Sequence, residues 1–398
     1  MSFWPRVPLN ETAVERGLVG GPFGSSLVGK DYVESGVPVI RGTNLNYGRE
    51  LGGDYAFVSE AKVSKDLARN VAEPGDLVFT QRGTLGQVAL VPFGGYAKYV
   101  VSQSQMRLRV DPAAASPVYL YYACSSGDFF KQISDNAIAT GVPHINLGIL
   151  SRLEVHLPSL NEQQGIADVL GALDNKIAAN AKLIASATDT STLLLAKELP
   201  TFPLSTLVTH RTKTVSPTLF VGGEVLHYSL PAFDTGQCPE STHPEAIKSS
   251  KFLVERSCVL VSKLNPRFPR IWDIPCAGDQ TSLASTEFLV LESKYSTSSV
   301  LWAILSQSSF GIALEAKAAG TSGSHQRVRP ADLLATEVID PRGLSATLHY
   351  QLKSLGQTRN RYREESAVLE ATRDVLLPQL MSGNLRVKDA EKKAEEVL

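Results

Sequence analysis

Residues 105–144 read QMRLRVDPAAASPVYLYYACSSGDFFKQISDNAIATGVPH, and residues 286–325 read TEFLVLESKYSTSSVLWAILSQSSFGIALEAKAAGTSGSH. The two stretches align without a gap at an offset of 181 residues, and most aligned positions match in size and apolarity. The aligned pairs include Leu108 with Leu289, Leu120 with Leu301, Tyr121 with Trp302, Phe129 with Phe310, and His144 with His325. We therefore predict two similar binding modules, which suit an extended ligand better than a small enclosed one.

A long helix is predicted after each copy of the repeat, over Asn161–Leu199 and Ser345–Met381. Apolar residues recur there in alternating steps of four and three, which is typical of a coiled-coil seam. The first seam is Ile166, Leu170, Leu173, Ile177, Asn180, Ile184, Ala187, Ser191 and Leu194, and the second is Leu348, Leu352, Leu355, Arg359, Tyr362, Ser366, Leu369, Arg373, Leu376 and Leu380. Two antiparallel helices that bury these seams against each other are expected, and a helix packed on its own module is the alternative. Polar Asn180, Arg359, Ser366 and Arg373 either fix the register or face a partner.

The expected fold class is α+β, with two globular α/β modules separated by the two long helices. We expect the first module at residues 1–158, the first helix at 159–199, the second module at 200–341, the second helix at 342–385, and a charged tail at 386–398 that frays. Strands are predicted at Val37–Ile40, Leu77–Thr80, Val88–Val91, Met106–Val110, Val225–Leu230, Cys258–Ser262 and Phe288–Leu291. Shorter helices are predicted at Tyr119–Cys124, Phe129–Ile133 and Val300–Ser306.

Composition indicates a globular protein of at least two domains. The chain has 398 residues, of which 43% are hydrophobic and 20% are charged. It has no apolar run long enough for a signal peptide or a membrane span, so we expect a cytoplasmic protein without a membrane partner. The four cysteines, Cys124, Cys238, Cys258 and Cys276, form no CxxC pair, and no histidine lies at metal-ligand spacing. We interpret them as reduced, buried thiols and expect no metal site.

Charge is distributed unevenly along the chain. The net charge of −1 at pH 7 argues against a nucleic-acid partner. Between Ala246 and Arg270, however, the sequence contains six basic residues and a single acid, Glu255, so one surface could carry a positive potential. Ordinary solvated surface charges are the alternative interpretation.

Motifs for catalysis are missing from the sequence. No GxxxxGK[ST] phosphate loop, GxSxG elbow, HExxH or paired carboxylate motif occurs. The segment GGPFGSS at 20–26 lacks the lysine of a nucleotide loop and is interpreted as a turn. The tetrad LNPR at 264–267 differs from the NPP[YF] motif of amino-methyltransferases, because Arg267 replaces the second proline. A non-catalytic protein is expected.

An ordered set of motifs resembles the specificity subunit of Type I restriction-modification systems. The first half contains GPFGSSL at 21–27, GVPVIRGTNL at 36–45, GDLVFTQRGTLGQVALVP at 75–92, TGVPHINLGIL at 140–150 and LPSLNEQQGIADVLGALDNKI at 157–177. The second half adds VLVSKLNPRFPRIW at 259–272 and LLPQLMSG at 376–383. The resemblance covers nearly the whole chain.

This resemblance implies two target recognition domains, each of which binds one half of a bipartite site on double-stranded DNA. It also implies methyltransferase subunits as partners, two of them expected, and a separate endonuclease and translocase subunit. No cofactor is expected on this chain, because S-adenosylmethionine, ATP and Mg belong to those partners. The expected partner-binding residues are Asn161, Glu162 and Gln163 at the start of the first helix, together with Arg359 and Arg373. The second helix starts without the Glu-Gln pair, so docking need not be equivalent there.

Polar residues in glycine-rich loops are the candidates for contacting DNA. In QRGTLG at 81–86, Arg82 could donate two hydrogen bonds to guanine and Gln81 could pair with adenine. The second module has a different polar and basic strip in the corresponding place, which predicts a different half-site. The full candidate set is Ser25, Lys30, Arg41, Gln81, Arg82, Thr84, Lys263, Asn265, Arg267 and Arg270. Each arginine could instead contact phosphate or have a structural role.

Two other classes of function remain open from the sequence. A protein-interaction scaffold would use the same two modules to bind protein, and its basic strips would be solvent faces. A self-contained methyltransferase would need a cofactor site that the sequence does not reveal. Salt dependence distinguishes DNA binding from the scaffold, because DNA affinity falls steeply with ionic strength.

Overall fold

The structure is a computed structural model that describes residues 4–139, 141–195, 199–220, 222–275, 280–318 and 326–398. The chain divides into two compact units, and each is described by itself. Unit 1 comprises Met1–Ala178 and Val368–Leu398, and unit 2 comprises Ala179–Ala367. Among the helices described, none has the length and apolarity to cross a membrane.

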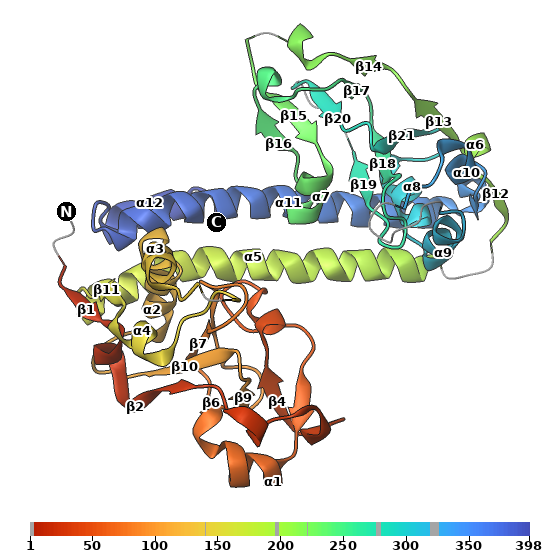
Figure 1. Ribbon diagram of the computed structural model, residues 1–398. Helices are drawn as coiled ribbons and strands as arrows, with labels where there is room; N and C mark the ends of the chain where they lie inside the picture. The colour runs from red at the N-terminus through yellow and green to blue at the C-terminus, as the bar shows by residue number, and fades with distance from the viewer. Residues whose placement is uncertain (1–3, 140, 196–198, 221, 276–279, 319–325) are drawn as a thin grey trace. The chain divides into compact units, whose positions relative to one another are not determined.

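Unit 1 contains three sheets (Figure 1). A four-stranded antiparallel sheet has the order β2-β10-β7-β8, and a five-stranded mixed sheet has the order β3-β5-β4-β9-β6, in which β4 and β9 are parallel. A two-stranded sheet joins β1 to β11. The strands are β1 Arg6–Pro8, β2 Ala13–Gly20, β3 Tyr32–Val33, β4 Val37–Ile40, β5 Ala56–Val58, β6 Val71–Ala72, β7 Leu77–Thr80, β8 Val88–Leu90, β9 Tyr99–Val101, β10 Gln105–Val110 and β11 Glu154–His156.

Except for α1, the helices of unit 1 form one core with the four-stranded sheet (Figure 1). The helices of this unit are α1 Glu60–Lys62, α2 Pro117–Cys124, α3 Gly127–Asn136, α4 Leu147–Arg152, the first part of α5 Leu160–Leu194, the last part of α11 Ala346–Met381, and α12 Val387–Glu395. Serine side chains cap α2 and α3, because Ser116 accepts from the N–H of Tyr119 and Ser126 from that of Phe129. Leu108, Phe129, Leu170 and Leu376 meet in one apolar cluster, so the long helices are part of this core.

Unit 2 repeats the topology of unit 1 except for the first strand of the five-stranded sheet, because β14 pairs with β17 at one edge whereas β3 of unit 1 pairs with β5 at the other. Its four-stranded sheet has the order β13-β21-β18-β19, and its five-stranded sheet has the order β14-β17-β20-β15-β16, with β15 and β20 parallel. The strands are β12 Thr201–Pro203, β13 Val208–Arg211, β14 Thr214–Val215, β15 Val225–Tyr228, β16 Glu240–Thr242, β17 Lys251–Val254, β18 Cys258–Ser262, β19 Ile271–Ile274, β20 Ser282–Ala284, β21 Phe288–Ser293 and β22 Glu337–Ile339. The short helices are α6 Leu204–Leu207, α7 Leu230–Gly236, α8 Ser298–Leu305, α9 Ser308–Ala316 and α10 Pro330–Leu334. The α+β fold class with two similar modules is confirmed.

The gapless alignment of the two repeats holds for the helices and fails for the strands. α2 and α8 start at 117 and 298, which is the predicted offset of 181. Leu108, however, faces Leu77 of β7, and the residue that takes this place in unit 2 is Leu291, which faces Val259 of β18. The connection from strand to helix is two residues shorter in unit 2, and this shift moves Leu289 out of the predicted pairing. His325, the predicted counterpart of His144, lies outside the described residues.

The seams of both long helices are buried or half-buried, as predicted. In unit 1 the helices run antiparallel: Gly165 lies against Val387, beyond the end of α11, whereas Asp174 further along α5 pairs with Arg373 at 2.9 Å. In unit 2 the Asn180 side chain of α5 donates to Glu365 of α11 at 3.0 Å. The first helix ends at Leu194, earlier than the predicted Leu199.

The charged tail does not fray. Val387–Glu395 forms α12, and Ala390 and Ala394 on one face of that helix are buried in the core of unit 1. The prediction was wrong because the many charges of the tail lie on the exposed face, where they do not oppose docking of the alanine face.

Cys124 and Cys258 are buried free thiols, and burial raises the pKa of both. Cys238 is half-buried, and Cys276 lies outside the described residues.

Candidate nucleic-acid interface

The predicted DNA-contacting loops are structurally equivalent hairpin loops in the two units. The β7–β8 loop is closed by the bond from Thr80 N to Gln87 O at 3.1 Å, and the β18–β19 loop by the bond from Ser262 N to Arg270 O at 2.9 Å. Gln81 and Lys263 then make matching backbone bonds. Gln81 donates to Ser104 and accepts from Ile145, and Lys263 donates to Glu287 and accepts from Val328. The same backbone frame therefore presents different side chains in the two units.

The β7–β8 loop presents the polar side chains that were predicted from the sequence. Arg82 and Thr84 are exposed, and Arg82 makes no side-chain hydrogen bond or ion pair with any residue that the structure describes. Gly83 has a φ of 107° and Gly86 a φ of 85°, which a side chain rarely adopts. Gly86 is further constrained, because a Cβ there would lie 2.3 Å from the Phe130 ring. The loop thus has a fixed backbone and a free guanidinium.

The other candidates of unit 1 lie beside this loop. A cavity of about 540 Å³ is lined by Gly24, Gly29, Arg41 and Ser104, and Ser104 O also accepts from the N–H of Gln81. Ser25 and Lys30 follow two of these lining residues and are exposed. Arg41 is anchored by a bond from Nη2 to Asp54 O at 3.0 Å. Ser104 therefore connects the cavity beside Arg41 to Gln81 and Arg82 at the start of the loop, whereas Thr84 lies further along the loop. Gln103, which holds the 24–27 segment through bonds to Gly24 O and Leu27 O, was not predicted.

The β18–β19 loop of unit 2 contains the candidates Lys263, Asn265, Arg267 and Arg270. Arg267 is exposed and lies over the ring of Phe268 at 5.7 Å, and Phe268 is itself 63% exposed. Asn265 has a φ of 53°, a conformation that asparagine tolerates better than most residues. Arg270 differs from the prediction, because its Nε and Nη2 donate to Asp234 at 2.6 and 2.9 Å. Those bonds raise the pKa of Arg270, so this arginine stabilises the base of the loop.

Three of the predicted partner-binding residues make hydrogen bonds or ion pairs with other residues of the same chain. Gln163 is 1% exposed and bonds to Ser116 N at 2.8 Å and to Pro158 O at 2.9 Å. Arg373 pairs with Asp174, and burial, which opposes the charged form, is outweighed by the bonds to Asp174 and Asp374, which raise its pKa. These contacts correct the prediction that Gln163 and Arg373 face a partner.

Arg359 is the third corrected residue and lies inside unit 2. Its side chain is 1% exposed, its guanidinium lies 3.2 Å from the centroid of the Trp302 ring, and Nη2 donates to Asp273 at 2.8 Å. Burial lowers the pKa of Arg359 to about 9, although Asp273 opposes the shift. The residue therefore fixes the register of α11. Asn161 and Glu162, in contrast, are exposed in the first turn of α5 and remain partner-binding predictions.

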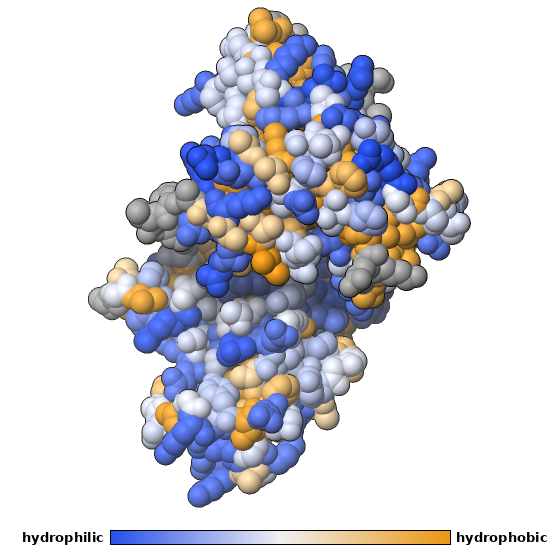
Figure 2. Space-filling model, turned by 90° about the vertical axis from the view of Figure 1, so that its right-hand side faces the viewer, coloured by the Kyte–Doolittle hydropathy of each residue, from blue (hydrophilic) through white to orange (hydrophobic). Residues whose placement is uncertain are grey.

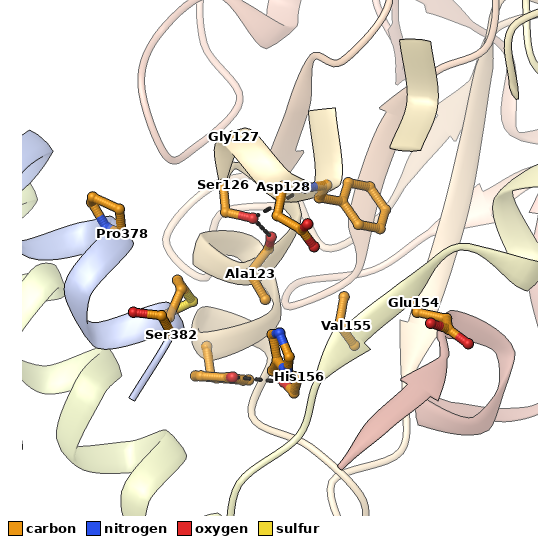
Figure 3. A pocket seen from close by; sticks show the side chains of 12 residues that line it. Ala123, Ser126, Gly127, Asp128, Glu154, Val155, His156, Pro378 and Ser382 are labelled. Atoms are coloured by element: carbon orange, nitrogen blue, oxygen red, sulfur yellow. Dashed lines mark hydrogen bonds between the residues drawn. The ribbon is translucent and has the colours of Figure 1, made fainter. Parts of the chain in front are cut away.

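A different cavity of unit 1, of about 280 Å³, lies between α2, α3, β11 and the end of α11 (Figure 3). It is lined largely by apolar atoms. Its polar groups mostly bond to neighbours: the Tyr119 hydroxyl donates to His156 O at 2.7 Å, and Ser126 Oγ donates to Ala123 O at 2.7 Å. His156 Nδ1 is buried without a hydrogen-bond partner among the described residues. This cavity contains none of the predicted DNA-binding residues.

Surface hydropathy fits polar recognition. On the face that Figure 2 shows, hydrophobic residues form separate patches among hydrophilic ones in each unit. That face has no single continuous apolar area of the kind that marks a large protein-docking site.

Comparison with known proteins finds similarity to one family in the first half of the chain. Residues 25–188 match the Type I restriction modification DNA specificity domain. The chain is 26% identical over 153 residues to the specificity subunit of the Type I restriction enzyme MjaVIII from Methanocaldococcus jannaschii, a match that covers 37% of this chain and 35% of that protein. The matched part thus spans about a third of the length of the curated relative.

The similarity in fold to a solved structure extends over nearly the whole chain. The crystal structure of the Type I restriction-modification S subunit from M. genitalium matches with a TM-score of 0.60 at 16% identity, and the match covers 95% of this chain and 96% of that one. At this identity the similarity shows a shared fold. The resemblance predicted from the sequence motifs is confirmed by the family model over residues 25–188 and by the shared fold.

Proposed function

We propose that this chain is the DNA-recognition subunit of a Type I restriction-modification complex, in which each unit binds one half of a bipartite, asymmetric DNA site. The observation that carries the proposal is the pair of equivalent hairpin loops. Gln81–Gln87 and Lys263–Arg270 occupy the same place in one topology, yet one reads QRGTLGQ and the other KLNPRFPR. Because side chains in such loops contact base edges, unlike loops are expected to select unlike half-sites.

The chemistry is assigned to partner subunits in this proposal. The chain would bind no cofactor, and S-adenosylmethionine, ATP and Mg would be used by methyltransferase and endonuclease subunits. The exposed first turn of α5 supports a docking role for Asn161 and Glu162. Two methyltransferase subunits are expected, one for each recognition unit, and the long helices would set the unread spacer between the half-sites.

The test uses the full chain with its cognate methyltransferase subunits in a host without other DNA methylation. We expect the methylome to contain one bipartite motif. R82A is expected to relax or weaken one half of that motif and R267A the other half, because loss of a base contact costs about 1–3 kcal/mol at that position. R152A removes an exposed arginine outside both loops and serves as the control.

Two outcomes would contradict the proposal. Absence of any bipartite motif with all subunits present would favour the scaffold function. If R82A and R267A altered the same half of the motif, the assignment of one half-site to each unit would be wrong.

A further inference from the structure

A groove in unit 1 lies between the edges of its two larger sheets. β2 is the edge strand of the four-stranded sheet and β6 that of the five-stranded sheet, and the Asn70 side chain, just before β6, bridges them through a bond to Gly20 O at 2.7 Å. The groove has a volume of about 940 Å³. The lining residues that matter are Gly20, Phe23, Arg69, Glu73, Arg107 and Arg109.

Arg107 is the most informative of these residues. It is 6% exposed, its Nε is buried without a partner, and its side chain makes no hydrogen bond with any part of the chain that the structure describes. Its nearest carboxylate is Asp76, at 3.8 Å from Nη1. Buried guanidinium groups normally have acceptors, because an unpaired buried donor is costly. Arg107 therefore lacks the acceptor that its burial calls for.

Asp76 does not require Arg107 for its own stabilisation. Arg109 bonds to both of its oxygens, with Nε to Oδ1 at 3.0 Å and Nη2 to Oδ2 at 3.0 Å, and the N–H of Glu73 donates to Oδ2 at 2.8 Å. Arg109 also pairs with Glu73 at 3.1 Å. Glu73, Asp76, Arg107 and Arg109 together carry no net charge, but the side-chain hydrogen bonds of Asp76 go to Arg109, so Arg107 has a charge partner at 3.8 Å and no hydrogen-bond acceptor among the described residues.

Unit 2 shows that the fold does not need this arginine. By strand register, Arg107 corresponds to Val290, Arg109 to Glu292 and Asp76 to Cys258. Val290 and Cys258 are buried in an ordinary apolar cluster. The same sheet therefore forms around a valine where Cys258 stands in place of Asp76, so the strand itself does not require an arginine at this position.

The groove adjoins the candidate DNA interface. Pro22, Phe23 and Ser26 line the groove, and Gly24 and Leu27 of the same segment line the cavity beside Arg41. Arg69 is exposed at the groove and has no ion pair within the described ranges. One short loop, GGPFGSS at 20–26, therefore separates the predicted base-contacting residues from a groove in which Arg69 adds a positive charge to the balanced set of Glu73, Asp76, Arg107 and Arg109.

We propose that this groove binds a phosphate of the DNA backbone next to the half-site that unit 1 recognises, with Arg107 and Arg69 as the phosphate ligands. The inference rests on the proposed DNA-recognition function and adds an anchor that unit 2 lacks. A guanidinium matches two phosphate oxygens with parallel hydrogen bonds, which would satisfy the donors of Arg107. Phosphate contacts fix orientation without reading sequence, so the anchor would raise affinity for all sequences alike.

The experiment measures duplex binding by the full chain with its methyltransferase subunits across a range of salt concentrations. R107M and R69M are each expected to weaken binding roughly tenfold, for a target duplex and a scrambled duplex equally. Each should also reduce the slope of log K against log salt by about 0.9. R152M removes the same charge outside the groove and should leave the slope unchanged.

The outcomes separate the anchor from the proposed function. If the wild-type complex binds duplexes with a steep salt slope and R107M and R69M match R152M, the anchor is wrong and DNA recognition stands. If the wild-type complex does not bind duplexes, the proposed function fails. R107V, which copies unit 2, should keep the melting temperature of the wild type; a large loss would indicate a structural role. Stabilisation by inorganic phosphate that R107M abolishes, with duplex affinity unchanged, would reassign the groove to a free anion.

Discussion

At the scale of single residues, the centre of unit 2 contains a buried ion pair that fixes a helix. Asp273 of β19 is 2% exposed and accepts from Ser299, Arg359 and Asn360 at 2.7, 2.8 and 3.0 Å. Two of these donors belong to α11, whose Gly356 approaches so closely that a Cβ there would lie 2.3 Å from Ser299 Cβ. The network therefore specifies one register of α11 against the sheet, which apolar contacts alone define less sharply.

We predict that R359M lowers the free energy of unfolding by about 3–5 kcal/mol, because it leaves the buried carboxylate without its cation. The double variant D273N/R359M removes both charges and should recover most of that loss. Urea unfolding of the full chain measures both quantities. K213M breaks an exposed pair with Glu255 and should cost less than about 1 kcal/mol. The single variant D273N completes the comparison. If the loss of stability in D273N/R359M equalled the sum of the losses in D273N and R359M, the two charges would not be coupled.

At the scale of elements, glycine decides where α12 packs. A Cβ on Gly165 of α5 would lie 2.8 Å from Val387 Cγ1, which has little freedom to move because valine is branched at Cβ. At Gly171, six residues further along the same helix, a Cβ would meet only the flexible end of Arg49, at 3.2 Å. The two glycines therefore differ in their surroundings although they share a helix.

Alanine at these two positions should have opposite effects. G171A is expected to stabilise the protein by up to about 1 kcal/mol through helix propensity. G165A should instead displace α12 and expose the C-terminal segment to protease. Thermal unfolding and limited proteolysis of both variants provide the measurement. Equal stabilisation by both changes would show that α12 does not pack against Gly165.

At the scale of the whole molecule, two units of one topology are joined by two helices that both continue from one unit into the other. α5 has 35 residues and α11 has 36 residues, so each spans about 52–54 Å. Under the proposed function these helices set the distance between the half-sites. Helix length would then be a determinant of the recognised DNA as direct as any base-contacting side chain.

Insertion of four residues into each of the two long helices tests whether helix length sets the distance between the half-sites. Placed at the boundaries between the units, after Ala178 and after Ala367, the insertions add about 6 Å to each helix. The spacer of the methylated motif should lengthen by about two base pairs, or recognition should be lost, because B-DNA advances roughly 34 Å per turn. Methylome sequencing measures the spacer. An unchanged spacer with full activity would contradict a ruler role.

The sequence by itself determined the duplication, the fold class, the helix seams and the positions of the polar loops. Hydrophobic periodicity and turn preference depend on residues that are close together in the chain, so they can be recognised before the chain folds. Val37–Ile40, Leu77–Thr80 and Cys258–Ser262 form strands with the bounds that their apolar runs predicted. The positions of Gln81 and Lys263 in equivalent loops also followed from the chain.

Tertiary structure decided how each charge is used. Arg82, Arg270, Arg359 and Arg107 carry the same charged group, yet one is free, one pairs with Asp234, one is buried against Trp302 and Asp273, and one is buried without an acceptor. These differences arise from residues that are distant in the chain and meet only after folding. The same holds for α12. Its alanines, Ala390 and Ala394, are buried in one core cluster with residues of α2 such as Leu120, which lie far earlier in the chain. A charge pattern along a chain therefore predicts potential contacts, and only the packed neighbours determine which of them remain available to a ligand.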